Sequence, residues 1–109
     1  MRRRLLLVED DRTLRQALSF TLTREGYEVA TAADGEAALE AARSGRLDLI
    51  LLDVMLPGMS GVEVLRVLRR EGVGTPVIVL SAKGDEIDRV VGLQVGGDDY
   101  VAKPFSRPE

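Results

Sequence analysis

Residues 49–61 read LILLDVMLPGMSG, an apolar run that ends on a carboxylate and leads into a loop. The run Leu47–Leu52 is nearly unbroken, which is typical of a parallel strand buried on both faces. The loop Val54–Met59 contains a proline and a glycine. Ser60 followed three residues later by Glu63 matches a capping box, in which the serine oxygen accepts from the third helical amide and the glutamate reaches back to the cap amide. This segment therefore predicts a strand, a loop and a helix.

The rest of the chain repeats this alternation in both directions. Further strands are expected at Leu5–Val8, Glu28–Ala32, Val77–Leu80 and Tyr100–Ala102. The expected helices are one with Leu14, Leu18 and Leu22 on one face and Gly26 at its end, one from Asp34 to about Arg43 closed by Gly45, one after Ser60 with Val62, Leu65, Val67 and Leu68 on its apolar side, and one from about Asp85 to Val95. Such alternation predicts an α/β fold with a parallel sheet between helices.

The last four residues, Ser106 to Glu109, have the S-x-x-E form of another capping box. They predict the start of a fifth helix that the chain does not continue. We therefore expect a C-terminally truncated domain, with apolar sheet surface exposed near Val101. Such a surface favours a homodimer or a swapped assembly.

Composition narrows the possible functions. A length of 109 residues provides one domain, and 45% hydrophobic with 4% aromatic residues predicts an aliphatic core. The net charge of −3 argues against direct nucleic-acid binding. The chain contains neither cysteine nor histidine, so a metal would need oxygen ligands, as Mg²⁺, Mn²⁺ and Ca²⁺ prefer. The apolar run after Arg2–Arg4 is too short for a secretion signal or membrane span, which favours a cytoplasmic protein.

Polar side chains follow the predicted strands at their carboxyl ends, where open α/β sheets bind ligands. These residues are Glu9, Asp10, Asp53, Ser81 and Lys103. The three carboxylates carry −3, which a divalent cation and one lysine would balance. Asp53 ends a very apolar strand, so its carboxylate needs a partner, and Mg²⁺ could be that partner. Mg²⁺ also binds phosphate oxygens, and carboxylates can act as nucleophiles. This edge therefore predicts a Mg²⁺-assisted phosphoryl site with Asp53 as the nucleophile.

Each of these residues also has a plainer interpretation. Asp11 is expected to cap the first helix, and an acidic run before a helix is often only a solvated turn. Lys103 alone would be a surface lysine, and Ser81 alone indicates little. Pro104 marks a turn and is a candidate for a cis peptide bond.

Four stretches together resemble the receiver domains of bacterial two-component response regulators of the OmpR/PhoB type. They are LLLVEDD (Leu5 to Asp11), LILLDVMLPGMSG (Leu49 to Gly61), TPVIVLSA (Thr75 to Ala82) and GGDDYVAKPF (Gly96 to Phe105). The resemblance implies a flavodoxin-like, doubly wound, five-stranded parallel sheet with strand order 2-1-3-4-5, here without its fifth helix.

The resemblance also implies roles for single residues. Asp53 would be the phosphoacceptor, and Glu9, Asp10, Asp53 and the backbone carbonyl of Met55 would hold Mg²⁺, with Mn²⁺ or Ca²⁺ as substitutes. Lys103 and Ser81 would contact the phosphoryl group, and Tyr100 would move with Ser81 as a switch. A sensor histidine kinase would be the donor, and a DNA-binding domain would follow in a longer protein. Ser81 stands where many relatives have threonine, and Gly97 where alanine is usual.

Three other interpretations remain at this stage. A metal-dependent phosphatase would need a second acid, which the loop after Asp53 does not supply. A flavodoxin-type cofactor module would need a phosphate loop after the first strand, where three acids stand instead. A degenerate receiver could serve as a scaffold only, but the complete set of site residues in this sequence argues against it.

Overall fold

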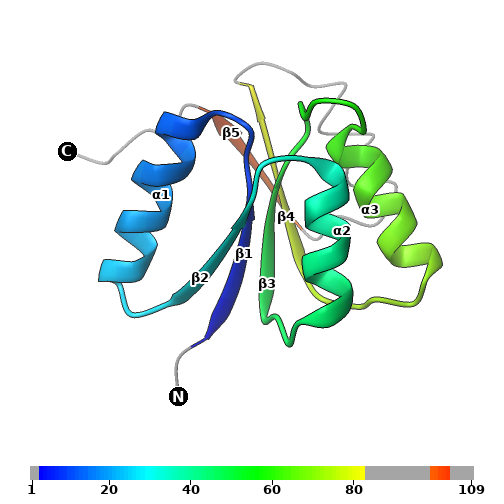
Figure 1. Ribbon diagram of the computed structural model, residues 1–109, viewed down its shortest axis with the longest axis horizontal. Helices are drawn as coiled ribbons and strands as arrows, with labels where there is room; N and C mark the ends of the chain where they lie inside the picture. The colour runs from blue at the N-terminus through cyan, green and yellow to red at the C-terminus, as the bar shows by residue number, and fades with distance from the viewer. Residues whose placement is uncertain (1–2, 83–98, 104–109) are drawn as a thin grey trace.

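The computed structural model describes residues 3–82 and 99–103 of the 109-residue chain, drawn in colour in Figure 1. For Ser44 and for strand residues 81–82 and 99–103, only the backbone is described. The strands are β1 (Arg4–Val8), β2 (Glu28–Ala32), β3 (Leu49–Asp53), β4 (Val77–Ala82) and β5 (Asp99–Lys103). The helices within the described residues are α1 (Arg12–Arg24), α2 (Gly35–Ser44) and α3 (Gly61–Arg70).

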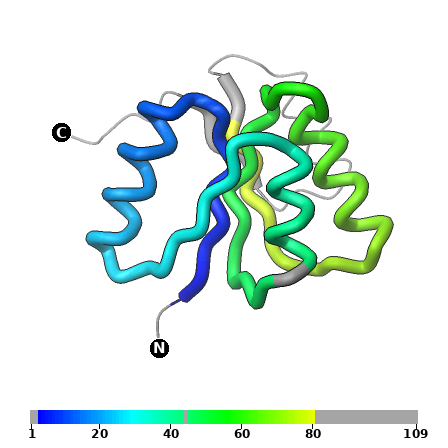
Figure 2. Tube along the Cα trace, viewed as in Figure 1, coloured from blue at the N-terminus to red at the C-terminus, as the bar shows by residue number. Residues whose placement is uncertain are grey.

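All strand pairs are parallel, and the sheet has the order β2-β1-β3-β4-β5. The predicted doubly wound topology is therefore confirmed, fifth strand included. Helix α1 covers one face of the sheet, while α2 and α3 lie side by side on the other (Figure 2). Parallel strands require crossover connections, and the crossovers bring every strand's carboxyl end to one edge.

The main core lies between the sheet and the pair α2 and α3. It is aliphatic, as the composition predicts, because strand and helix side chains of leucine, valine, isoleucine and alanine meet there. The apolar side of α3 differs from the expected one: Val64 is fully buried together with Leu65 and Leu68, whereas Val62 and Val67 are only partly buried. Val64 lies three positions after Gly61 and four before Leu68, so the helical period places it on the same face.

The third strand begins later than predicted. Leu47 and Asp48 precede β3 because Asp48 closes the chain onto β1: its carboxylate accepts from the Arg4 amide at 2.7 Å, and its own amide donates to the Arg4 carbonyl at 2.8 Å. The expected burial on both faces is also only partly correct. Ile50 is buried on one face of the strand. Leu49 and Leu51 on the other face are half-buried and line a cavity of about 380 Å³ beside α1.

The helix ends follow the predicted capping chemistry with two differences. Asp11 and Asp34 accept from the amides of Leu14 and Ala37 at 3.2 and 2.8 Å, and Gly26 has the left-handed φ of 101° expected after α1. By contrast, Gly45 closes α2 in an extended conformation, with φ −104°.

Ser60 forms only half of the predicted box. Its hydroxyl oxygen accepts from the Glu63 amide at 3.1 Å, while the Glu63 carboxylate pairs with Arg66 at 2.8 Å. Among the hydrogen bonds of the described residues there is none from the Ser60 amide to Glu63. The nearby cation on the same helix therefore takes the carboxylate that the box would use.

Several expectations lie outside the described residues. These are the helix from about Asp85 to Val95, the fifth helix from Ser106, the peptide bond before Pro104 and the side chain of Val101. Over the part of the chain that is described, no helix combines the length and apolar character needed to cross a membrane.

Candidate functional site

Three of the predicted site residues converge at the carboxyl edge of the sheet. Glu9 and Asp10 follow β1 directly, and Asp53 is the last residue of the neighbouring strand β3. Each side chain offers one carboxylate oxygen such that the three oxygens lie within 4.8 Å of one another. The sequence prediction that these acids share one site is therefore consistent with the geometry.

The Glu9 carboxylate is held inside the protein. The residue is fully buried, and its Oε2 accepts from the Asp11 amide at 3.1 Å. Its backbone amide donates to the Ala32 carbonyl at 3.0 Å, which continues the β1–β2 ladder by one bond. Because that bond fixes the chain beyond the strand end, Glu9 points into the site from a rigid support, whereas Asp10 next to it is exposed.

Asp53 is also buried, with 1% of its surface exposed. Its Oδ1 accepts from the Met55 amide at 3.3 Å, so the loop after β3 folds back over the carboxylate. Met55, whose carbonyl was expected to be a metal ligand, therefore lies beside the acidic cluster in sequence and in space. Its own side chain is 66% exposed.

Gly61 supports Asp53 from behind, a role that the sequence did not indicate. A Cβ atom at Gly61 would collide with the backbone oxygen of Asp53 and come within 2.9 Å of the Val54 Cα. The Gly61 amide donates to the Val54 carbonyl at 2.8 Å. The start of α3 is thus pressed against the strand end that carries Asp53. The available signal was the glycine itself, because glycine is the residue that permits a close backbone approach.

Arg15 is a second contributor that sequence reasoning missed. Its Nη1 donates to the carbonyl oxygens of Glu9 at 2.9 Å and Asp10 at 3.3 Å. The signal in the sequence was a cation in the first turn of α1. Helix N-termini favour negative charge, and this first turn contains no acid.

The other predicted residues are placed by their backbones only. Ser81 follows Leu80, which pairs with Asp53 in the sheet register, and Lys103 ends β5 opposite Ala82. Both therefore lie at the same edge of the sheet as the three acids. Tyr100 lies further down β5, opposite Val79.

The chemistry of the donor set fits a hard divalent cation. Three carboxylates with two of them buried bring −3 to a small volume, and close like charges repel strongly where water is excluded. Only oxygen is offered, which suits Mg²⁺ or Ca²⁺ and not a softer metal.

Comparison with known proteins agrees with this arrangement. Residues 5–109 match the response regulator receiver domain, so the chain belongs to this family. It is 50% identical over its whole length to the DNA-binding response regulator MtrA of Mycolicibacterium smegmatis. It is 57% identical over 100 residues, or 92% of the chain, to the transcriptional regulatory protein AfsQ1 of Streptomyces coelicolor. The resemblance to OmpR/PhoB-type regulators is thereby confirmed.

The chain spans less than half of these relatives, 47% of MtrA and 44% of AfsQ1. Among solved structures it resembles the response regulator TrrA of Thermotoga maritima in complex with Mg²⁺-BeF. The TM-score is 0.85 at 36% identity, over 95% of this chain and 89% of TrrA. The fold and the acidic edge are therefore those of a receiver domain.

Proposed function

We propose that this chain is a phosphorylation-controlled switch that accepts a phosphoryl group on Asp53. The observation that carries the proposal is the convergence of Glu9, Asp10 and Asp53 within 4.8 Å at the carboxyl edge of a receiver fold. Mg²⁺ bound there, with the Met55 carbonyl as a further ligand, would neutralise charge on the carboxylates and on the phosphoryl oxygens. The Mg²⁺ complex of TrrA supports this assignment.

In the proposed transfer an ionised Asp53 oxygen attacks phosphorus, and the bond from phosphorus to the donor breaks. The electron pair leaves with the donor atom, and no proton has to be removed from the nucleophile. The protein's contribution is position and charge. Lys103 would pair with a phosphoryl oxygen and Ser81 would donate its hydroxyl to another, with Tyr100 moving as Ser81 is drawn in.

The wider setting follows from the same proposal. Residues 1–109 would be the receiver part of a cytoplasmic two-component regulator, with a sensor histidine kinase as phosphoryl donor. The names of MtrA and AfsQ1 support a longer protein that controls transcription through a DNA-binding domain. The chain would be modified and restored, so it would act as a switch and not as a turnover enzyme.

Intact mass after incubation with acetyl phosphate and Mg²⁺ tests the proposal. We expect the mass of one added phosphoryl group on the wild type and none on Asp53→Asn. Asp48→Asn, which changes an aspartate just before the other end of β3, is the matched control and should label as the wild type does. Labelling that persists in Asp53→Asn would overturn the assignment of the acceptor, and sustained hydrolysis of phosphate esters would favour a hydrolase instead.

A further inference from the structure

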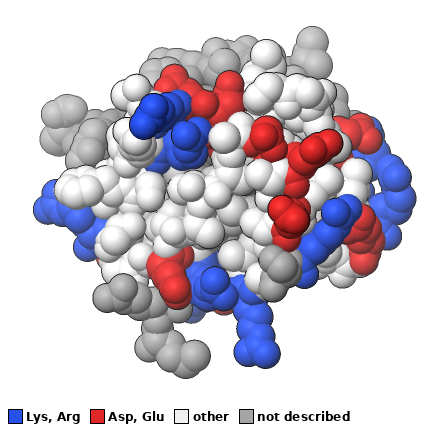
Figure 3. Space-filling view, viewed as in Figure 1, with Lys and Arg blue, Asp and Glu red and all other residues white. Residues whose placement is uncertain are grey.

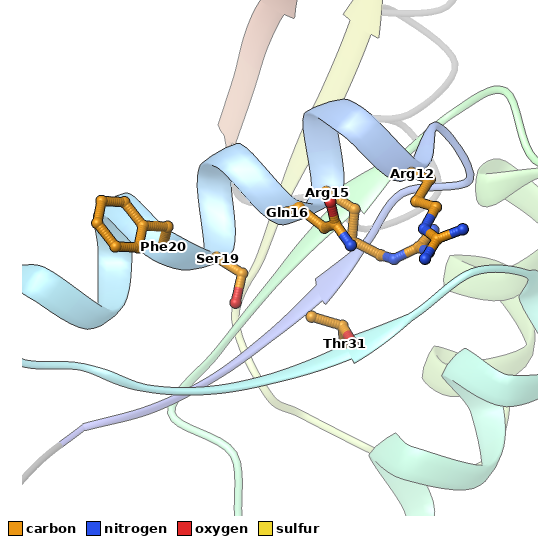
Figure 4. A pocket seen from close by; sticks show the side chains of 6 residues that line it. All are labelled: Arg12, Arg15, Gln16, Ser19, Phe20 and Thr31. Carbon is orange, nitrogen blue, oxygen red and sulfur yellow. The ribbon is translucent and has the colours of Figure 1, made fainter.

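Arg15 ties α1 to the segment that carries two of the three acids. One guanidinium nitrogen bridges two successive carbonyls, those of Glu9 and Asp10. Figure 4 shows Arg15 extending along the pocket between α1 and β2 towards the end at which α1 begins, with Phe20 at the opposite end. The side chain is half-buried, so part of its length is fixed by packing.

The direction of these bonds matters. Arg15 donates to backbone oxygens, not to the carboxylates. It therefore holds the peptide units from which the two carboxylates project and does not itself occupy a carboxylate oxygen. Hydrogen bonds from a charged donor are about twice as strong as neutral ones, so the 2.9 Å bond to the Glu9 carbonyl is the main restraint on this short loop.

Electrostatics alone would give Arg15 the opposite effect. A positive charge close to a cation site repels the cation and lowers its affinity. Figure 3 shows basic side chains directly beside acidic ones at the edge of the molecule where α1 begins. Arg12 extends to the same end of the pocket as Arg15, but its side chain makes no hydrogen bond to another described residue.

We infer that Arg15 is a positioning residue for the cation site, which it preorganises by holding the backbone of Glu9 and Asp10. This inference rests on the proposed function, because it concerns the same three carboxylates. Residues that orient metal ligands typically change metal affinity by roughly 10- to 100-fold when they are replaced. Arg15 acts on the ligands' main chain, so its loss raises the ordering cost that cation binding must meet.

The test is direct binding of Mn²⁺, with the free ion measured by electron paramagnetic resonance and Mg²⁺ used as competitor. Arg15→Met removes the charge and the hydrogen bonds, and we expect affinity to fall roughly tenfold. Arg15→Lys keeps the charge and a donor but changes the shape of the head group, and we expect a smaller loss. Arg12→Met is the matched control: it removes a charge from the same end of the pocket and should bind as tightly as the wild type or more tightly.

The outcomes separate the inference from the function beneath it. Tighter binding by Arg15→Met, with wild-type binding by Arg15→Lys, would mean that charge alone acts and would overturn the inference. Wild-type binding by both variants would overturn it as well, while leaving the proposed function intact. A wild type that binds no Mn²⁺ would overturn the cation site together with the inference. Circular dichroism checks that each variant is folded, and Arg15→Lys alone decides if Arg15→Met is not.

Discussion

The Cα atom of Gly61 lies so close to the backbone carbonyl of Asp53 that no side chain fits between them. A Cβ atom built on Gly61 would collide with that oxygen and lie 2.8 Å from the carbonyl carbon. The obstacle is main chain, which cannot swing aside as a flexible side chain would. The start of α3 and the end of β3 therefore form one rigid unit, and the buried Asp53 carboxylate projects from it.

Gly61→Ala should consequently move Asp53 or push α3 away from the sheet. Alanine improves helix propensity by up to about 1 kcal/mol, but overpacking typically costs about 1–3 kcal/mol, and contact with main chain favours the upper end. We expect a net loss of stability in urea denaturation and a marked fall in labelling by acetyl phosphate. Gly74→Ala is the control, since a Cβ there meets nothing within 4 Å.

Labelling kinetics would distinguish displacement of Asp53 from simple loss of folded protein. Labelling is measured without urea, at a temperature where circular dichroism shows that Gly61→Ala is folded. Under these conditions its labelling rate should still be reduced. A wild-type rate together with wild-type stability would show that the backbone adjusts without cost, contrary to this account.

The fold was largely predictable because local chemistry and topology agree. Apolar runs of strand length, separated by capped helical segments, leave few arrangements other than a doubly wound sheet. Asp11, Asp34 and Ser60 all cap the helices that they were expected to cap. One of the failures was tertiary in origin. The start of β3 was misplaced because Asp48 bonds to Arg4 on a strand far away in sequence, a contact that no local pattern reveals.

The site was predictable in its acidic residues but not in the residues that support them. Glu9, Asp10 and Asp53 were found because strand ends collect at one edge of a parallel sheet. Arg15 and Gly61 were not found, because their contributions are a pair of long-range hydrogen bonds and a close backbone approach. The roles of Ser81, Lys103 and Tyr100 stay predictions.

Removal of one carboxylate should reveal the repulsion within the acidic cluster. We expect Asp10→Asn to be slightly more stable than the wild type in the presence of a chelator, by on the order of 1 kcal/mol, because one of three close negative charges is gone. Addition of Mg²⁺ at about one hundred times the dissociation constant should stabilise the wild type by about 2.7 kcal/mol. The same addition should do much less for Asp10→Asn.

Thermal unfolding with and without Mg²⁺ measures both effects. Asp11→Asn is the matched control, since it removes the same charge one residue away and asparagine caps helices as well as aspartate does. Its response to Mg²⁺ should equal that of the wild type. An equal response by Asp10→Asn would show that Asp10 is not a ligand.

The half-formed capping box at α3 gives a prediction about stability. Ser60→Ala removes the acceptor of the Glu63 amide and should cost about 1 kcal/mol in urea denaturation. Glu63→Gln should cost only about 0.2–0.5 kcal/mol, because the carboxylate pairs with Arg66 on the helix surface. Ser19→Ala in the interior of α1 is the control and should be neutral or slightly stabilising. Glutamine can still complete a capping box, so Glu63→Ala tests for it. A loss for Glu63→Ala well above that for Glu63→Gln would mean that the full box forms in solution.

The ion pair between α2 and the end of α3 should make stability depend on pH in the acid range. Arg43 donates from Nε and Nη2 to the two Glu71 oxygens at 2.9 and 2.6 Å, and these bonds lower the pKa of Glu71 in the folded protein. The stabilisation is therefore fully present above the unfolded value of about 4.3 and disappears as pH falls through the lower folded value. Arg43→Met should be less stable than the wild type at neutral pH, and this difference should shrink below about pH 4. Urea denaturation across this pH range measures the difference in stability. Glu71→Gln should likewise approach the stability of the wild type as pH falls. Added salt should reduce the difference at neutral pH. A difference between wild type and Arg43→Met that stays constant with pH would mean that the arginine stabilises by packing and not through the Glu71 carboxylate.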